Sequence, residues 1–208
     1  MPDLIYAEQL DEPDRFTRGE ILLRGVVGGV VVAGAIVIGG LPELSLSAQS
    51  SRQDAEILNF ALVFEGLQAA FYAEANAKNV LRGELATFAR VVGSQELAHA
   101  AYVRRALGGA ARKLPRFNVK AVTDDPGRFA RTATELEDLG VAAYNGVGPS
   151  LTRAALAAVA PIASVEARHA AWIRGVLGEV PAPVASDASV TAAQAASAVN
   201  RTGLVASP

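Results

Sequence analysis

The chain has 208 residues, a length that suits one domain with appendages. Its composition is 51% hydrophobic but only 6% aromatic, with alanine prominent, which favours packed helices. The net charge of −2, without a basic stripe, makes nucleic acid a poor partner, and the lack of cysteine excludes thiolate zinc sites, iron–sulfur clusters and disulfides.

An uncharged run near the N-terminus separates a polar leader from the rest of the chain. Residues 25–41 contain six glycines and no charge, and their length of 17 residues is at the lower limit of the roughly 17–25 that cross a bilayer. Arg15, Arg18 and Arg24 precede the run, so the positive-inside rule places the N-terminus in the cytoplasm and the following domain outside. A buried core helix is the alternative, although six glycines make a poor helix interior. We expect residues 1–48 to be a signal or anchor.

The leader also resembles a twin-arginine export signal. The sequence Thr17-Arg18-Gly19-Glu20-Ile21-Leu22-Leu23 follows that pattern except at Gly19, where the second arginine would stand. Small residues at 45–48 match a signal-peptidase site weakly, so a cleaved and a membrane-anchored form both remain open.

Four helical segments are predicted after this leader, because apolar residues recur at alternating three- and four-residue steps. Their expected ranges are residues 53–79, 83–107, 126–145 and 150–177. Asp124 or Asp125 can cap the third segment, and Pro161 predicts a kink or break in the fourth. Residues 179–208 are rich in Ala, Ser and Val and predict a tail with at most one weak helix, around residues 189–200.

The only two histidines of the chain stand in repeated contexts. Glu96-Leu97-Ala98-His99 and Glu166-Ala167-Arg168-His169 are each followed by two alanines, an aromatic residue, a β-branched residue and arginine. Residues three apart in a helix lie on one face, about 5–6 Å apart, so each carboxylate and imidazole can bind the same ion. A single such pair is usually solvated, whereas two matching pairs on apolar helix faces predict half of a dinuclear metal site.

A second repeat supplies two more carboxylates. Residues 64–72 align without gaps with residues 136–144, which pairs Glu65 with Glu137. Glu65 precedes Glu96 by 31 residues, and Glu137 precedes Glu166 by 29. Glu135 competes with Glu137, but positions two apart differ by about 200° around a helix, and only Glu137 matches the repeat.

These repeats together define six candidate metal ligands: Glu65, Glu96, His99, Glu137, Glu166 and His169. The lone glutamates would be terminal ligands, the two motif glutamates would bridge the ions, and each histidine would give one nitrogen per ion. Such nitrogen and oxygen donors suit iron, manganese or zinc and permit oxygen chemistry. Tyr72 and Tyr144 each follow a lone glutamate by seven residues. They are either core tyrosines or catalytic helpers that donate to the ligands or relay electrons.

Two short-loop hairpins joined by the long segment 110–125 predict an all-α, ferritin-like four-helix bundle with one long crossover over residues 49–178. Three stretches, residues 57–62 leading to Glu65, 140–146 and 166–174, resemble the bacterial ferritin-like proteins often labelled desiccation-related. The resemblance covers residues 53–178 and implies a diiron-type bundle in proteins that are often exported. More distantly the chain is similar to rubrerythrin, which reduces peroxide, and to manganese catalase.

The chain departs from these relatives at three points, one of which is Pro161 in the fourth helical segment. Gln68 stands where relatives often carry a second carboxylate on the first helix, and the cysteine iron site of rubrerythrin is missing, so electrons cannot enter by that route. We expect an exported or membrane-anchored protein that binds two iron ions, or manganese. It would act as an oxidoreductase on Fe(II), oxygen or peroxide in stress protection, and a homo-oligomer is compatible with this. The alternative is a noncatalytic envelope bundle with a structural metal or none.

Overall fold

A computed structural model of the chain describes residues 52–206, and within them the regular structure is helical. The helices are α2 (Arg52–Lys78), α3 (Gly83–Leu107), α4 (Pro126–Val147), α5 (Arg153–Val176) and α6 (Ala192–Arg201). Three single 3₁₀ turns, η1 (Gly108–Ala110), η2 (Lys120–Val122) and η3 (Gly148–Ser150), lie in the connections. The expected signal or anchor, with its apolar run at residues 25–41, lies outside the described residues.

Local sequence explains where the long helices begin and end. The side chain of Asp125 accepts a hydrogen bond of 2.8 Å from the backbone N–H of Arg128, and Pro126 opens α4. Thr152 caps α5 in the same way and is itself bonded to the buried Asp54 at the start of α2. Gly108 follows α3 with φ of 52°, a left-handed backbone angle that glycine adopts without strain.

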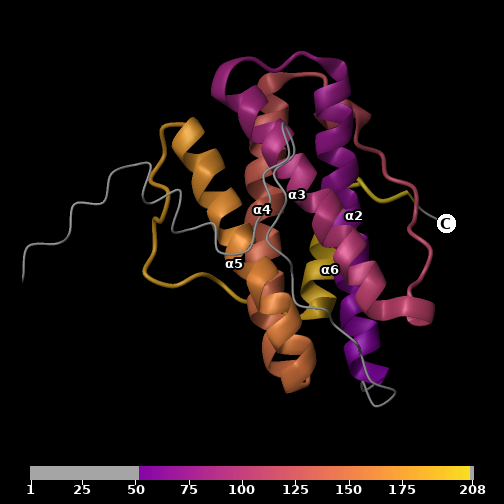
Figure 1. Cartoon of the computed structure of the whole chain (residues 1–208). Coiled ribbons are helices and arrows are strands. Elements are labelled where there is room, and N and C mark those ends of the chain that lie inside the picture. Colours follow the sequence, from indigo (N-terminus) through magenta and orange to yellow (C-terminus); the bar gives the residue numbers. More distant parts are fainter. Residues whose placement is uncertain (1–51, 207–208) are drawn as a thin grey trace, which may run out of the picture. The chain divides into compact units, whose positions relative to one another are not determined.

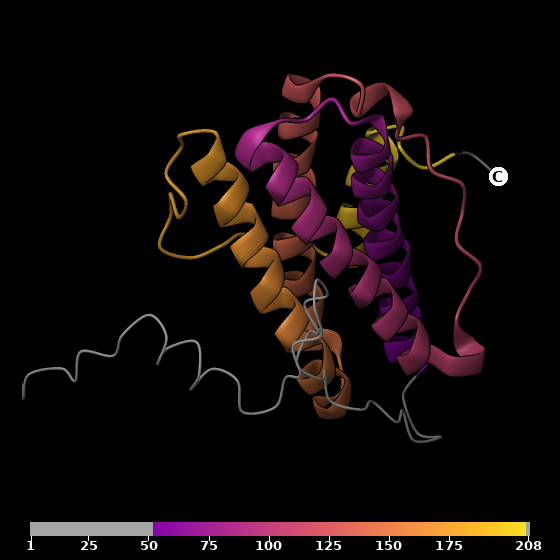
Figure 2. The same cartoon turned by 45° about the horizontal axis from the view of Figure 1, so that its top comes forward.

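The four long helices form two antiparallel hairpins that pack on each other (Figures 1 and 2). α2 packs along α3 and α4 packs along α5, while α3 with α5 and α2 with α4 close the bundle. The connections within each hairpin are short, and the long segment between α3 and α4 is the crossover between hairpins. This is the predicted all-α bundle with one long crossover.

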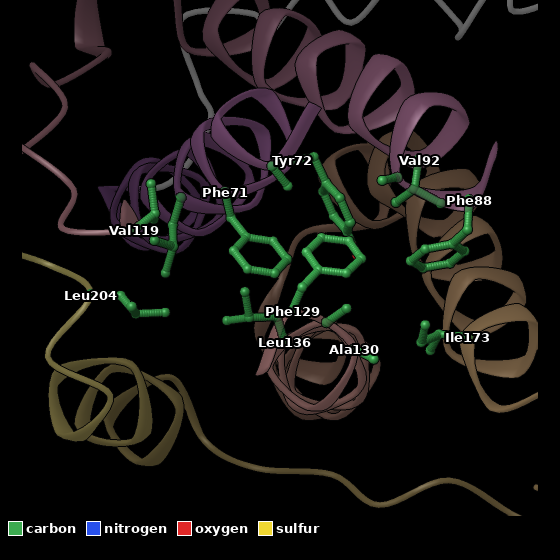
Figure 3. Close-up of a cluster of buried hydrophobic side chains, with 14 of the residues drawn as sticks. Phe71, Tyr72, Phe88, Val92, Val119, Phe129, Ala130, Leu136, Ile173 and Leu204 are labelled. Atoms are coloured by element: carbon green, nitrogen blue, oxygen red, sulfur yellow. The ribbon is translucent and has the colours of Figure 1, made fainter. Parts of the chain in front are cut away.

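An aromatic cluster fills one part of the bundle core (Figure 3). The rings of Phe71 and Phe129 stack with centroids 5.0 Å apart, and Tyr72 meets both rings edge-on. Phe88 extends the cluster towards Trp172, again by edge-on contacts. The rings of Phe71, Phe88 and Phe129 are rigid and fully buried. They therefore hold Tyr72 in a single position beside the polar centre of the bundle.

Hydrogen bonds from a side chain and from the backbone attach the crossover and the C-terminal segment. Asn59 of α2 donates to the carbonyl of Ala110 and accepts from the N–H of Arg112 at 2.7 Å. Further along, Phe117 and Val205 form an isolated β-bridge. In the segment that follows α5, a capping box of Thr191 and Gln194 starts α6, and α6 packs on α4. The weak helix expected near residues 189–200 is therefore present and docked.

Of the kink or break expected at Pro161, the break is absent, since α5 runs through this residue without interruption. Proline removes the hydrogen bond to the carbonyl four residues earlier, at Ala157. Both residues are exposed, so water can satisfy that carbonyl. None of the helices between residues 52 and 206 combines the length and the hydrophobicity that a bilayer crossing requires.

Candidate metal centre

The six candidate ligands converge in the middle of the bundle. α2 and α4 contribute one glutamate each, and α3 and α5 contribute one Glu-x-x-His motif each. The four glutamates are fully buried, and His99 and His169 are 3% and 2% exposed. Burying four carboxylates is strongly unfavourable unless they are paired or coordinate a cation, so this cluster needs a compensating partner.

The six side chains divide into two overlapping groups. Glu65 and His99 complete one group, and Glu137 and His169 complete the other, while Glu96 and Glu166 belong to both. In each group the four ligand atoms lie within 4.8 Å of one another. Two sites that share two carboxylates are the arrangement of a dinuclear centre with bridging glutamates.

Both imidazoles turn the same nitrogen towards the carboxylates. Nδ1 of His99 lies 3.3 Å from an oxygen of each of Glu65, Glu96 and Glu166. Nδ1 of His169 lies 2.9 Å from Glu96 and 3.2 Å from Glu137. A single N–H donates well to one acceptor, whereas a cation attracts several oxygens at once, so this convergence fits a metal better than a proton.

Several buried oxygens at this centre make no well-aligned hydrogen bond within the described residues, although three of them lie 2.9–3.3 Å from Nδ1 of a histidine. They are Glu65 Oε2, Gln68 Oε1, Glu96 Oε1 and Glu166 Oε1. Buried polar atoms are almost always bonded, and an exception in a native core calls for an explanation such as an ion. Unsatisfied carboxylate oxygens beside two imidazoles are the donor set that iron and manganese accept, so the residues fit such a pair of ions.

Each tyrosine predicted beside the centre donates to a lone glutamate. The hydroxyl of Tyr72 lies 2.5 Å from Glu137 Oε1, and the hydroxyl of Tyr144 donates to Glu65 Oε1. These bonds cross between hairpins, because Tyr72 lies on α2 with Glu65, and Tyr144 lies on α4 with Glu137. The tyrosines are therefore partners of candidate ligands as well as core residues.

Two glutamines at the centre were not among the predicted site residues. The amide of Gln68 donates to Glu137 Oε1 at 3.1 Å and to Glu166 Oε2 at 3.4 Å. Gln95 Oε1 lies 2.5 Å from Nε2 of His169. Gln68 could have been found as the polar residue one helical turn after Glu65, and Gln95 as the neighbour of Glu96 that breaks the repeat.

Protonation reflects the crowding of charge. Burial, followed by repulsion from neighbouring carboxylates, raises the pKa of Glu65 and of Glu166 to about 7. Burial alone would lower the pKa of His99, but hydrogen bonds with Glu166, Glu65 and Glu96 outweigh it and raise that pKa to about 12. Burial would also lower the pKa of His169, but its contacts with Glu137 and Glu96 outweigh burial and raise that pKa to about 10. Protons thus balance the carboxylates without a metal, and cations would replace them.

The register of α4 agrees with the repeat. Glu137 is fully buried in the centre, whereas Glu135 is exposed on the other side of the helix. The residue next to Glu137, Asp138, binds Arg174 of α5 with both carboxylate oxygens 2.6 Å from one nitrogen. This pair links α4 to α5 just outside the centre, and it assigns Arg174 a partner that its position at the end of α5 does not predict.

Comparison with known proteins agrees with this geometry. The family model described as ferritin-like domain matches residues 53–179, which include every residue of the candidate centre. No curated protein matches the chain in a sequence search.

Proposed function

Because the chain belongs to the ferritin-like domain family, we propose that its centre binds two iron ions, with manganese as the alternative, and oxidises Fe(II) or consumes peroxide. The observation that carries this proposal is the pair of overlapping four-residue groups with shared glutamates. A structural site for one ion would need only one such group. The doubled arrangement instead suits chemistry in which two ions change charge together.

Each ion would be held by its own pair of residues and by two shared glutamates. Glu65 with His99, and Glu137 with His169, would each bind one ion, while Glu96 and Glu166 would lie between the two. When bound, two redox-active ions supply two electrons, the number that reduces oxygen to peroxide or peroxide to water. Four glutamates carry four negative charges, which match two divalent cations.

The protein around the ligands controls orientation and water. The phenols of Tyr72 and Tyr144 occupy one oxygen of each lone glutamate and leave the other to face the histidines. Ligating carboxylates whose free oxygen is bonded in this way keep their orientation when ions bind. The near-complete burial of the ligands restricts bulk water, so small reactants such as oxygen and peroxide suit the site best.

We further propose that the protein acts in stress protection outside the cytoplasm. The support is the uncharged run at residues 25–41 with arginines before it, together with the resemblance to exported relatives. Electrons would come from a separate donor, because the chain has no cysteine with which to hold an iron–sulfur site of its own.

The test is metal analysis followed by turnover on the full chain, purified without added metal and then loaded with Fe(II). We expect close to two ions per chain and oxidation of added Fe(II) by oxygen or peroxide, and in Glu137→Gln we expect a fall towards one ion with loss of oxidation. Glu135→Gln is the matched control, because this exposed glutamate lies two residues away on the same helix and should leave both unchanged.

The outcomes separate the candidate functions. Two bound ions without any oxidation would refute the catalytic proposal and favour a noncatalytic bundle with a structural metal. A stable protein that ignores added Fe(II) and Mn(II) would refute the metal centre altogether. If Glu135→Gln abolished binding while Glu137→Gln did not, the ligand assignment on α4 would be wrong.

A further inference from the structure

The internal repeat allows the two halves of the centre to be compared position by position. The ligands and both tyrosines match, but two neighbouring positions do not. Gln68, three residues after Glu65, corresponds to Gly140, three residues after Glu137. Gln95, which precedes Glu96, corresponds to Val165, which precedes Glu166. In each pair of aligned positions, one half has an amide side chain and the other half has glycine or valine.

Both amides act on the same half. Gln68 donates to Glu137 and Glu166, and Gln95 accepts from His169, so every one of these bonds reaches the group of Glu137 and His169. The group of Glu65 and His99 shares only the contact with Glu166. At Gly140 even a Cβ atom would lie 2.7 Å from Glu166 Oε2, so a side chain there would displace this carboxylate.

The bond from Gln95 bears directly on metal binding. When Nε2–H of His169 donates to the amide oxygen, the ring is held in one orientation with Nδ1 among the carboxylates, where Nδ1 can give its lone pair to an ion that replaces its proton. Such partners of a ligating histidine raise its basicity, and losing one typically weakens metal binding about 10–100-fold. Val165, at the matching position beside Glu166, has no group that could do this for His99.

The surroundings of the two tyrosines differ in the same direction. Tyr72, the partner of Glu137, is fully buried among Phe71, Phe88 and Phe129 (Figure 3). Tyr144, the partner of Glu65, is 7% exposed. Its ring lines an apolar indentation with Phe60, Ala61, Phe64, Ala143 and Val147. Tyr144 is thus nearer to solvent than Tyr72, while the ligands of both groups are equally buried.

We propose that the two metal positions are unequal: the position of Glu137 and His169 holds its ion tightly, and the position of Glu65 and His99 exchanges its ion. This inference rests on the proposed metal centre. Fixed ligand orientation lowers the cost of binding at the first position, whereas at the second position the His99 imidazole, which has no counterpart of Gln95, must order when the ion arrives. The exchanging position is where substrate Fe(II) would enter and leave.

The test is calorimetric titration of the metal-free full chain with Mn(II), which binds without being oxidised under nitrogen. Wild-type protein should show two phases of one ion each, with dissociation constants at least about tenfold apart. Gln95→Val should weaken the tight phase about 10–100-fold and leave the weak phase unchanged. Gln68→Leu, a second variant of similar volume, should act in the same direction.

Matched variants in the other half complete the design. Val165→Gln is the control for Gln95→Val and should leave the tight phase unchanged. His169→Ala should remove the tight phase, and His99→Ala the weak one. Two ions of equal affinity in the wild type, equal weakening of both phases by Gln95→Val, or the reverse assignment of the histidines would overturn the inference while the dinuclear centre stands. Failure of Mn(II) and Fe(II) to bind at all would overturn the proposed function as well.

Discussion

At the scale of single residues, each tyrosine braces the lone glutamate of the opposite hairpin. Burial, and then the charge of the glutamate that it contacts, raises the pKa of both Tyr72 and Tyr144 well above its usual value. The hydroxyls therefore stay protonated and donate at physiological pH. Each fixes Oε1 of its glutamate, while Oε2 of the same carboxylate faces a histidine. The carboxylates are oriented before any cation arrives.

Removal of these hydroxyls should loosen the ligands unequally. Tyr144→Phe leaves Glu65 Oε1 without its phenol donor, and a hydrogen bond to a charged group contributes about 1.5–3 kcal/mol, so we expect Mn(II) binding at that position to weaken about tenfold or more. Tyr72→Phe should have a smaller effect, because Gln68 still donates to Glu137 Oε1. Titration with Mn(II) measures both. Unchanged binding in both variants would show that the tyrosines serve only to pack the core.

The six clustered residues could be predicted because their signal is local. A Glu-x-x-His spacing places both groups on one helix face, and the repeat selects Glu137 over Glu135 without knowledge of the fold. The bonds of Gln68 and Gln95 could not be predicted, because each joins two helices whose relative position only packing determines. The same holds for Asp138 and Arg174, which are 36 residues apart in sequence.

At the scale of elements, periodicity predicted the four long helices, and cap residues such as Asp125 placed their starts. Pro161 does not break α5, because the cost of a proline inside a helix depends on whether the carbonyl that loses its partner is buried or exposed. The docking of α6 and the β-bridge between Phe117 and Val205 join segments far apart in sequence. Nothing in their local composition signals that they meet.

The attachment of the crossover depends strongly on Asn59. This buried amide bonds the carbonyl of Ala110 and the N–H of Arg112, so Asn59→Ala leaves two backbone groups without their partner. We expect the free energy of unfolding to fall by about 1–3 kcal/mol in chemical denaturation. Gln53→Ala, which removes an exposed bond from the same helix to Ser150, should stay within about 0.5 kcal/mol of wild type. Equal losses in both would show that the crossover is held by other contacts.

At the scale of the whole molecule, the location of the bundle is a prediction from residues outside the described part of the chain. The uncharged run at residues 25–41, with arginines before it, predicts a domain beyond the cytoplasmic membrane. A reporter enzyme that is active only after export, fused after Pro208, should therefore be active. Substitution of Arg15, Arg18 and Arg24 by glutamate should reduce its activity, because the charge asymmetry is lost. A reporter that works only in the cytoplasm would contradict the prediction.

Metal should also set the stability of the whole bundle. Without ions, the four fully buried glutamates depend on protons, their own and those of the histidines, to offset their repulsion, and they lack the contacts with water that they have in the unfolded chain. Ions that bind only the folded state stabilise it by about 2.7 kcal/mol at a concentration 100 times the dissociation constant. For a domain of this size that corresponds to a rise in Tm of roughly 5–10 °C. Thermal unfolding with a chelator and with added Mn(II) measures the difference. The double substitution His99→Ala and His169→Ala removes both nitrogen ligands, so the rise should vanish. Persistence of the rise in this variant would mean that Mn(II) stabilises the protein at another place.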